Sequence, residues 1–373
     1  MSENSLVEVK NLVVRFYTYA GIVEALDGVN LKVKPGEILG LVGETGCGKS
    51  VTSFSILQLV PPPGAIEEGE IYFNKDGKVI DVRGLHKEAI RQMRGKEIAM
   101  IFQEPRAYLN PVYTVETQIG EVLLTHRGKD LLERAMQTLK KTGRKASFEN
   151  RVYKMMLIRP KSITTRIMSR FCSKKALKAE ILKEVVNLLG SVGIADPERV
   201  AKMYPFELSG GMAQRAVIAM ALSCQPVMLI ADEPTTNLDV TVQAQILNLI
   251  KELRENYKSS ILYITHDLGV IAELCDRVAV MYAGNVVETA NVYELFDSPL
   301  HPYTKALLES IPRPGVEFKS IPGIVPSLIN PPKGCRFHDR CEFEMDVCRK
   351  VKPEFIEVKK DHFVACHLYG GSK

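Results

Sequence analysis

The residues from Gly43 to Ser50 have the types and the spacing of a loop that binds phosphate. They fit the pattern G-x-x-x-x-G-K-S, in which glycines let backbone N–H groups turn toward an anion. Lys49 would bring a positive charge to the β- and γ-phosphates, and Ser50 a hydroxyl group to Mg²⁺. The alternative is a glycine-rich turn in which Lys-Ser occurs by chance. The candidate phosphate-binding residues are Gly43, Glu44, Thr45, Gly46, Cys47, Gly48, Lys49 and Ser50.

Two carboxylates follow an apolar run at residues 227–231. Asp232 is placed to hold Mg²⁺ through water, and Glu233 to polarise an attacking water molecule as a general base. Two solvated acids at the end of a strand are the alternative interpretation. A phosphate loop in the same chain makes that alternative less attractive, because both features serve phosphoryl transfer.

A third motif, residues 208–215 (LSGGMAQR), places a hydroxyl and two glycines before a helix. This arrangement suits a second anion site, although an ordinary helix cap would use the same residues. The order of the motifs along the chain resembles that of the ABC-type ATPases. That order is the phosphate loop, Gln103, Ser209-Gly-Gly, Asp232-Glu233, Asn237-Leu-Asp239 and His266.

The resemblance implies further roles, with ATP and Mg²⁺ as ligands. Gln103 would sense Mg²⁺ and water and couple the site to a partner. Ser209 and Gly211 would cover the ATP bound by an opposite subunit, and Asp239 would lie in the loop that crosses the dimer interface. His266 would contact the γ-phosphate, whereas an isolated histidine at a strand end is usually just a satisfied polar residue. The catalytic set implied is Glu233, His266 and Gln103, and the magnesium set Ser50, Gln103 and Asp232.

An aromatic residue near the N-terminus usually stacks on adenine in this family. Phe16, Tyr17 and Tyr19 are all candidates, and strand packing is the alternative role for each. The sequence does not choose among them.

Three other segments resemble the ATPase subunits of dipeptide and oligopeptide importers. They are residues 233–245, 281–284 and 301–308. The resemblance implies a subunit that hydrolyses ATP to power import of di- or oligopeptides, as an ATPase pair closes around ATP. It also implies a similar but distinct second ATPase, two membrane permeases, an extracellular binding protein, and a peripheral place on the cytoplasmic face of the membrane. One departure from the family is Asn237, where Ala is commoner.

Several other functions are alternatives to this one. Short oligosaccharides or nickel are alternative cargoes, because the ATPase does not touch cargo. A soluble ABC ATPase acting on ribosomes or nucleic acid usually has two ABC units or a long coiled coil. This chain has one signature and no heptads. An exporter ATPase is disfavoured by the proline-rich cysteine tail.

The tail holds four of the eight cysteines, with spacings of x5, x6 and x17. Four thiolates can hold Zn²⁺ or a [4Fe–4S] cluster, and unligated thiols are a third possibility. The resemblance to the importer ATPases favours [4Fe–4S] with a structural role. The candidate ligands are Cys335, Cys341, Cys348 and Cys366.

Positive charge is concentrated between Arg127 and Ala179, where 16 Lys and Arg face three acids. This window carries +13 in a chain whose formal charge is +5, so the remainder carries −8. One interpretation is an amphipathic element that touches anionic lipid beside the permease. A contact with the permease or second ATPase, and a solvated insertion without a binding role, are the alternatives. Nucleic acid is disfavoured because no recognition module is evident.

The elements that position these motifs alternate between strands and helices, which predicts an α/β fold with a largely parallel core sheet. We expect buried strands at 38–42, 98–102, 227–231, 261–264 and 278–281, and a helix after the phosphate loop to about Val60. The fold class expected is an ABC-type P-loop ATPase core with a helical subdomain and a small Pro/Cys-rich C-terminal module. The expected divisions are an ATPase domain at 1–298, its helical subdomain at about 104–225 with the basic insertion 127–179, and the module at 299–373.

Composition excludes several classes. Of the 373 residues, 46% are hydrophobic and 25% charged, which is ordinary for a globular protein and unlike a disordered chain. Eight cysteines are too few for a disulfide scaffold. The two longest uncharged runs, 50–66 and 216–231, are both shorter than the ~20 residues that a transmembrane helix needs. No secretory signal is evident, so we expect a cytosolic protein with reduced thiols.

Overall fold

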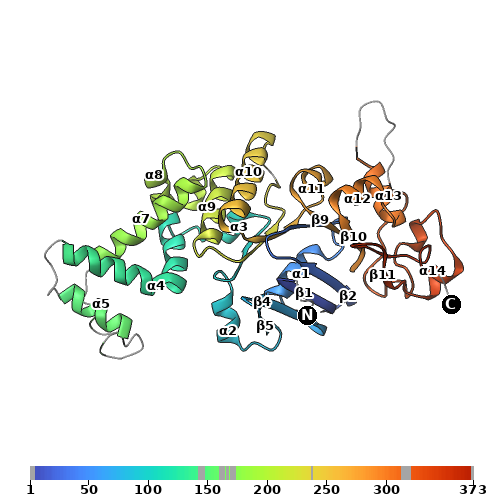
Figure 1. Ribbon diagram of the computed structural model, residues 1–373, viewed down its shortest axis with the longest axis horizontal. Coiled ribbons are helices and arrows are strands. Elements are labelled where there is room, and N and C mark those ends of the chain that lie inside the picture. Colours follow the sequence, from blue (N-terminus) through green and yellow to red (C-terminus); the bar gives the residue numbers. More distant parts are fainter. Residues whose placement is uncertain are drawn as a thin grey trace. The chain divides into compact units, whose positions relative to one another are not determined.

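The structure is a computed structural model (Figure 1). The chain folds into two compact units. The described residues are 5–141, 148–158, 164, 168, 174–236, 238–311 and 321–370. Unit 1 comprises residues 1–94, 227–233 and 250–373, and unit 2 comprises 95–226 and 234–249. Asn237 and parts of the basic insertion lie outside the described residues.

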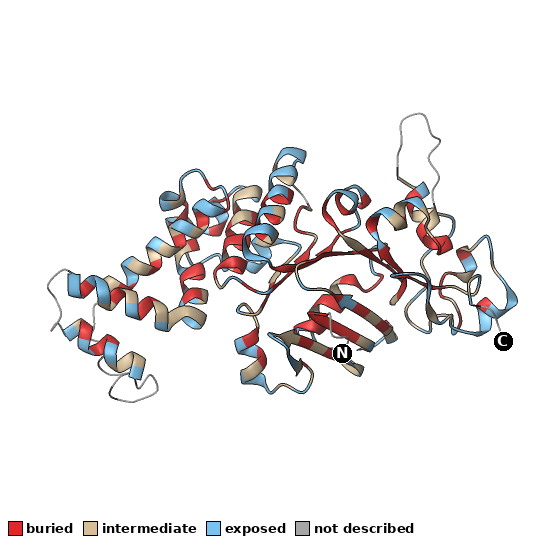
Figure 2. Ribbon diagram, viewed as in Figure 1, coloured by how far each residue is buried: buried red, intermediate tan, exposed pale blue. Residues whose placement is uncertain are grey.

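A parallel sheet forms the core of unit 1. Strand β3 (Ile38–Val42) pairs with β8 (Ser260–Ile264) on one side and with β9 (Arg277–Tyr282) on the other, and β7 (Met228–Asp232) pairs with β8. Every residue of β3, β7 and β8 is buried. Parallel strands that are covered on both faces have continuous apolar sequences, which is why these strands could be predicted. Figure 2 shows the buried residues concentrated in these strands.

The same sheet continues through antiparallel strands. β10 (Asn285–Asn291) pairs with β9, β12 (His362–Ala365) pairs with β10, and β11 (Phe355–Lys359) pairs with β12. Within unit 1 the strand order is therefore β11-β12-β10-β9-β3-β8-β7. The last strands of the chain thus extend the sheet that carries the phosphate loop.

A second, antiparallel sheet in unit 1 has the order β2-β1-β4-β5. Its strands are β1 (Val7–Thr18), β2 (Gly21–Val33), β4 (Gly64–Lys75) and β5 (Lys78–Asp81). The apolar residues of these N-terminal strands form much of the local core. Val7, Leu12, Val14, Leu26 and Val29 are at most 1% exposed.

The helices of unit 1 are short. They are α1 (Lys49–Ile56), α2 (Lys87–Met93), α11 (Leu268–Leu274), α12 (Val292–Asp297), α13 (Pro302–Glu309) and α14 (Asp346–Lys350), with a 3₁₀ turn η2 (His338–Arg340). Helix α1 ends earlier than the expected Val60. Gln58 has a φ of +50°, so the backbone leaves the helical region well before the prolines at 61–63.

Unit 2 is mainly helical, as predicted. It contains β6 (Ile98–Ile101), α3 (Pro105–Tyr108), α4 (Val115–Lys141), α5 (Phe148–Ile158), α7 (Lys175–Ser191), α8 (Pro197–Lys202), η1 (Pro205–Glu207) and α9 (Gly210–Leu222). Helix α10 (Val240–Tyr257) contributes residues to both units. Helix α4 packs on α7, α5 packs on α4, and α9 packs on α7. None of the helices among the described residues combines the length and apolar character needed to traverse a lipid bilayer.

Candidate nucleotide site

The phosphate loop joins the end of β3 to the start of α1 in unit 1. Glycine is required at both ends of the loop. Gly43 has a φ of +153°, and a Cβ there would lie 2.1 Å from the carbonyl oxygen of Met281. Gly48 has a φ of +106°, and its Cβ would lie 2.6 Å from the Leu26 side chain. The backbone conformation and the close packing therefore both exclude a side chain.

Lys49 is held inside this loop. Its ammonium donates to the carbonyl oxygens of Gly43 at 2.7 Å and Glu44 at 3.1 Å, and the residue is buried. Thr45 and Gly46, at the tip of the loop, are exposed. Gly46 also has a positive φ, +81°, but a Cβ there would meet no atom within 4 Å. The loop thus surrounds one buried cation and leaves its tip open.

Asp232 lies at the end of β7, beside Ser50 and Lys49. It is 3% exposed, and its Oδ1 atom has no hydrogen-bond partner. Burial raises the pKa of this carboxyl, as does the neighbouring Glu233, whereas a hydrogen bond with Ser50 and the charge of Lys49 lower it. A buried carboxylate oxygen without a partner next to a hydroxyl is suited to a cation such as Mg²⁺.

Glu233 and His266 come together at the ends of two neighbouring strands, β7 and β8. The Oε1 atom of Glu233 lies 3.3 Å from Nδ1 of His266, and the backbone N–H of Glu233 donates to the carbonyl of Ile264. Glu233 has a φ of +46°, which is uncommon for a residue with a side chain. Strained backbone of this kind clusters at functional sites.

The remaining family motifs lie in unit 2. Ser209 is the N-cap of α9, and its Oγ accepts from the N–H of Met212 at 3.2 Å. A Cβ on Gly211 would lie 3.0 Å from the Val242 side chain. Asp239 is exposed and directly precedes α10. Its carboxylate accepts from the N–H of Val242, in the first turn of that helix, at 2.9 Å. In the structure Ser209 is thus a helix cap, and its exposure leaves room for a further ligand.

Gln103 follows β6 and is exposed. It lines a surface cavity of about 280 Å³ within unit 2, together with residues from the segments around α3, α9 and 236–238. These lining residues are Gln103, Glu104, Pro105, Arg106, Ala107, Gly210, Thr236 and Leu238. Gln103 and the glycine-rich signature are therefore brought together, although 106 positions separate Gln103 from Ser209.

The three aromatic candidates for adenine differ in their surroundings. Phe16 lies in β1, and its ring packs against Gly64 so closely that a Cβ on Gly64 would lie 2.6 Å from it. The hydroxyl of Tyr17 is hydrogen-bonded to Glu67. Tyr19 lies in the turn between β1 and β2 and is fully exposed. Tyr19 is thus the most exposed of the three rings, and Tyr17 is also 51% exposed.

The four cysteines of the tail all lie in one part of unit 1, and their thiols interact electrostatically. Burial, together with the charge of the neighbouring cysteines, raises the pKa of Cys335 to about 12 and that of Cys366 to about 11. Backbone hydrogen bonds link the segments, including Cys335 N–H to the Cys348 carbonyl at 2.7 Å. Among the described residues, no group of three His, Cys, Asp or Glu side chains is positioned to hold a metal ion.

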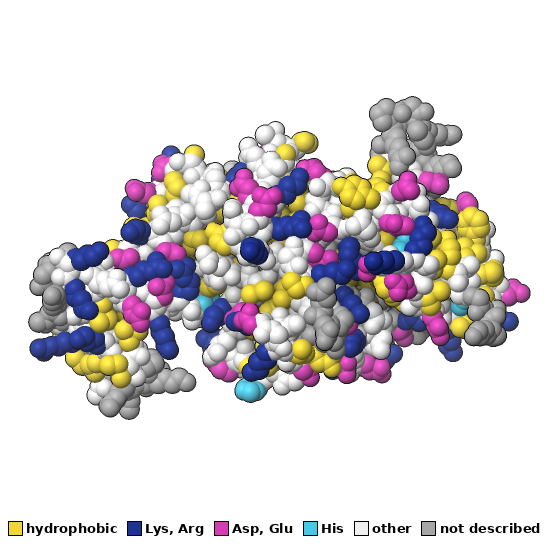
Figure 3. All heavy atoms as spheres, in the orientation of Figure 1, with side chains coloured by type: hydrophobic (Ala, Val, Ile, Leu, Met, Phe, Trp, Pro, Cys, Tyr) yellow, Lys and Arg dark blue, Asp and Glu magenta, His cyan; other side chains and the backbone are white. Residues whose placement is uncertain are grey.

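Part of the basic segment is neutralised within unit 2. Arg127 and Arg134 both bind Glu184 of α7, at 2.6 and 3.1 Å, and both also bind Asp130. Other cations stay exposed, and Figure 3 shows Lys and Arg gathered over the α4, α5 and α7 end of unit 2 around apolar side chains. On α5, Phe148 and Ile158 are 48% and 75% exposed.

Two residues that contact the phosphate loop were not found from the sequence. The hydroxyl of Tyr303 accepts from the N–H of Glu44 at 3.0 Å, and Arg340 binds the Glu44 carboxylate. Tyr303 lies in the segment 301–308 that carried the importer resemblance, which was the available signal. Arg340 gave no signal of its own, because a lone arginine beside a cysteine matches no motif.

Comparison with known proteins agrees with the fold and the motifs. Residues 26–236 match the ABC transporter family, and residues 287–348 match the family described as oligopeptide/dipeptide transporter, C-terminal region. The dipeptide transport ATP-binding protein DppD of Bacillus subtilis is 44% identical over 367 residues, covering 97% of this chain and 94% of that protein. A probable peptide ABC transporter ATP-binding protein, y4tR, of Sinorhizobium fredii is 44% identical over 365 residues, covering 97% and 94%.

Solved structures show the same fold. The dimeric post-hydrolysis state of the ATP-binding cassette MJ0796, bound to ADP and Pi, superposes with a TM-score of 0.55 at 24% identity, covering 77% of this chain and 98% of that one. The cbiO1 protein from Clostridium perfringens gives a TM-score of 0.53 at 26% identity, covering 79% and 92%. The predicted ABC ATPase fold is confirmed. The chain therefore belongs to the ABC transporter family, as an ATPase subunit of the oligopeptide/dipeptide importer type.

Proposed function

We propose that this chain binds MgATP at the phosphate loop and hydrolyses it to drive peptide import through a membrane permease. The observation that carries the proposal is the convergence, in one compact unit, of Lys49 in its loop, the unpartnered buried oxygen of Asp232, and the Glu233–His266 pair. Lys49 and the loop N–H groups would hold the β- and γ-phosphates. Bound Mg²⁺ would neutralise charge that develops on the phosphates, with Ser50 and Asp232 as its candidate holders within unit 1.

Glu233 would act as the general base. Its carboxylate accepts a proton from water while the water oxygen attacks the γ-phosphorus, and ADP departs with the broken bond's electron pair. His266, 3.3 Å from this carboxylate, would orient Glu233 and contact the γ-phosphate. Glu233 has a positive φ directly after β7, a backbone strain of the kind that clusters at functional sites.

The site needs a second chain in this account. Ser209, Gly211 and Asp239 belong to unit 2 and would complete the ATP site of an opposing ATPase, as the exposed N-terminus of α9 allows. MJ0796 has a dimeric structure. Importers of this type usually combine two different ATPase chains, so a heterodimer is the proposed arrangement. Tyr19, exposed at its turn, would stack on adenine.

Di- or oligopeptides are the proposed cargo, because relatives at 42–44% identity are named as peptide, dipeptide or oligopeptide transport proteins. The proposed location is the cytoplasmic face of the membrane, bound to two permeases that receive peptide from an extracellular binding protein. The test is affinity purification of the tagged chain from gently solubilised membranes. Co-elution of two permeases and a second ATPase supports the importer. A chain that elutes alone or with ribosomes contradicts it.

A [4Fe–4S] cluster is the proposed ligand of Cys335, Cys341, Cys348 and Cys366. The donor set fits, since four electrostatically coupled thiols lie in one short module, and each could bind a different iron rather than crowd around one ion. The cluster would supply structural stability to the module. Anaerobically purified protein should contain iron and acid-labile sulfide in equal amounts, with a visible absorption that bleaches on reduction. Zinc in their place would identify the alternative ligand, and neither would reject both.

An anionic lipid contact is a secondary proposal for the basic insertion. It is supported by the exposed apolar residues Phe148 and Ile158 beside the exposed cations Arg151 and Lys154 on α5. Vesicles of phosphatidylglycerol should bind the full chain better than vesicles of phosphatidylcholine, and Arg151→Glu with Lys154→Glu should remove the difference. Equal binding to both vesicles would leave a solvated insertion or a protein contact.

A further inference from the structure

Glu44 places a carboxylate in the phosphate loop, where it adds negative charge close to the place at which an anion must bind. The structure pairs this charge with Arg340, which lies 296 positions away in η2 of the cysteine module. The two side chains form a bidentate ion pair, with Nη1 to Oε2 at 2.8 Å and Nη2 to Oε1 at 3.1 Å. The arginine side chain is 4% exposed and that of Glu44 is 26% exposed.

Arg340 is itself rigidly placed. Its Nε donates to the carbonyl of Pro322 at 2.8 Å, and Nη1 also donates to the hydroxyl of Tyr282 at 3.1 Å. The guanidinium lies over the rings of Tyr282 and Phe337, at 5.6 and 5.8 Å from their centroids. All three guanidinium nitrogens therefore make hydrogen bonds, as expected for a planar group fixed by a bidentate partner.

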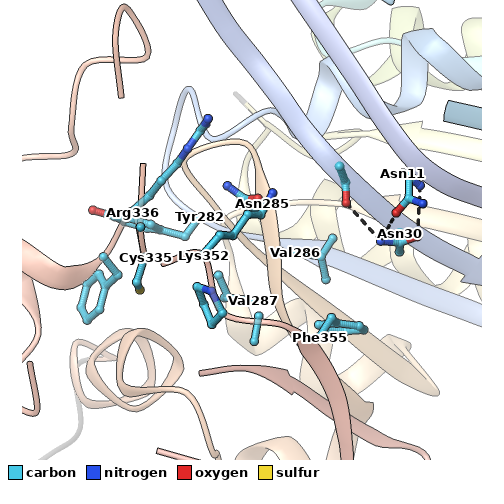
Figure 4. Close-up of a pocket in the computed structure, with 15 residues that line it drawn as sticks. Asn11, Asn30, Tyr282, Asn285, Val286, Val287, Cys335, Arg336, Lys352 and Phe355 are labelled. Atoms are coloured by element: carbon cyan, nitrogen blue, oxygen red, sulfur yellow. Dashed lines mark hydrogen bonds between the residues drawn. The ribbon is translucent and has the colours of Figure 1, made fainter. Parts of the chain in front are cut away.

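Arg340 is directly followed by Cys341, one of the four tail cysteines. A second arginine of the module also lies next to a tail cysteine. Arg336 follows Cys335, is 5% exposed, and donates to the carbonyl of Ala283 at 2.6 Å. Figure 4 shows Cys335 and Arg336 beside Tyr282, at one side of a cavity of about 210 Å³.

Arg336 also reaches the phosphate loop through the backbone. The N–H of Gly284, next to Ala283, donates to the carbonyl of Cys47 at 2.8 Å. Of the two arginines beside tail cysteines, Arg340 thus contacts the phosphate loop directly at Glu44, whereas Arg336 bonds the turn at 283–284, which in turn bonds the loop at Cys47.

We propose that Arg340 is a positioning residue for ATP binding, which neutralises Glu44 and makes the C-terminal cysteine module part of the nucleotide site. This inference rests on the proposed binding of ATP phosphates by residues 43–50. Without Arg340, the Glu44 carboxylate is unpaired beside the loop and repels the nucleotide, and the repulsion grows with the number of phosphate charges. Tyr303 still holds the Glu44 backbone, so the main loss is electrostatic.

The experiment is equilibrium binding of MgATP and MgADP to the full chain, with variants at both partners. Arg340→Gln should weaken ATP binding about tenfold, and ADP binding by less. The Glu44→Gln variant removes the carboxylate while Arg340 stays charged, and it should bind ATP at least as tightly as the wild type. The double variant removes both charges, so it should bind ATP nearly as the wild-type pair does and thereby relieve the loss seen in Arg340→Gln. Arg340→Lys, which keeps the charge but loses the fork, should fall between wild type and Arg340→Gln.

Two controls separate the possible failures. Arg349→Gln removes an arginine of the same module that is 64% exposed and paired with Glu344, and it should bind ATP as the wild type does. Lys49→Ala tests the phosphate site itself. If Lys49→Ala binds ATP normally, the proposed function fails. If Lys49→Ala loses binding while Arg340→Gln does not, only the role of Arg340 fails. A further outcome is that Arg340→Gln weakens binding of ATP and ADP equally, with no recovery when Glu44→Gln is added. That result would mean that Arg340 has a purely structural role, and it would overturn the inference.

Discussion

Gly43 and Gly46 lie three positions apart in the phosphate loop. Replacing each by alanine distinguishes the cost of overpacking from the cost of backbone strain. Both have positive φ, +153° and +81°. A Cβ on Gly43 would lie 2.1 Å from the carbonyl oxygen of Met281 and 2.8 Å from Sγ of Cys47, whereas a Cβ on Gly46 would meet nothing within 4 Å. The same added atom therefore strains both sites but overpacks only one.

The expected costs follow from these two terms. Left-handed backbone costs a non-glycine residue about 1–2 kcal/mol, so Gly46→Ala should lower the free energy of unfolding by about that amount. Overpacking a dense core costs about 1–3 kcal/mol more, which gives Gly43→Ala a total of about 2–5 kcal/mol. Since the carbonyl of Met281 belongs to a buried strand, the loop must move instead, and a shift of ~1 Å at a catalytic site can lower the rate about 10²-fold.

The assay is urea unfolding of both variants, with ATP affinity and steady-state hydrolysis on the same preparations. Gly43→Ala should lose both stability and ATP binding, and Gly46→Ala should keep ATP binding within a few-fold of wild type. Equal effects of the two substitutions would refute the reasoning, because strain alone would then explain the glycines. Normal hydrolysis by Gly43→Ala would show that the close approach to β9 does not matter.

Two other predictions concern His301 and Tyr19. His301 is fully buried, burial lowers its pKa to about 4, and the unfolded value is about 6.5; stability is therefore lost as pH falls from about 6.5 to about 4, with about 2 kcal/mol gone by pH 5. The His301→Asn variant keeps an acceptor for the Tyr303 N–H. In urea unfolding at pH 7 and pH 5, it should lack the loss of stability that His301 causes. If the free energy of unfolding of this variant falls between pH 7 and pH 5 as much as that of the wild type, His301 is excluded as the source. Tyr19→Ala should weaken ATP binding about tenfold by loss of stacking, while Tyr293→Ala, which removes another highly exposed tyrosine, should not; equal affinities would assign adenine to Phe16 or Tyr17.

Those parts of the fold in which short-range pattern and burial agree could be predicted from the sequence. The runs at 38–42, 227–231 and 261–264 are apolar because both faces of a parallel strand are covered, and each leads into a motif. Ser209 was expected to open a helix, and it caps α9. Strands β10, β11 and β12 were not predicted, since short antiparallel strands near a sheet edge depend on their partners more than on their own pattern.

Long-range contacts account for the rest. The sequence identified Glu44 as a loop residue, but its pairing with Arg340 joins positions 296 apart and depends on the fold of the tail. The basic segment gave a strong charge signal, yet Arg127 and Arg134 turn out to share Glu184 on another helix. Net charge along a sequence cannot show which cations are already paired.

Glu233→Gln gives the most direct test of the central claim that Glu233 activates water at a phosphate site. The substitution keeps the size of the side chain and removes the proton acceptor, so ATP should still bind with near wild-type affinity. Steady-state hydrolysis in the assembled complex should fall by about 10²–10⁴-fold, the usual contribution of a general base. Tight ATP binding with almost no turnover is the predicted result. Normal turnover by Glu233→Gln would contradict the account and remove Glu233 as the base.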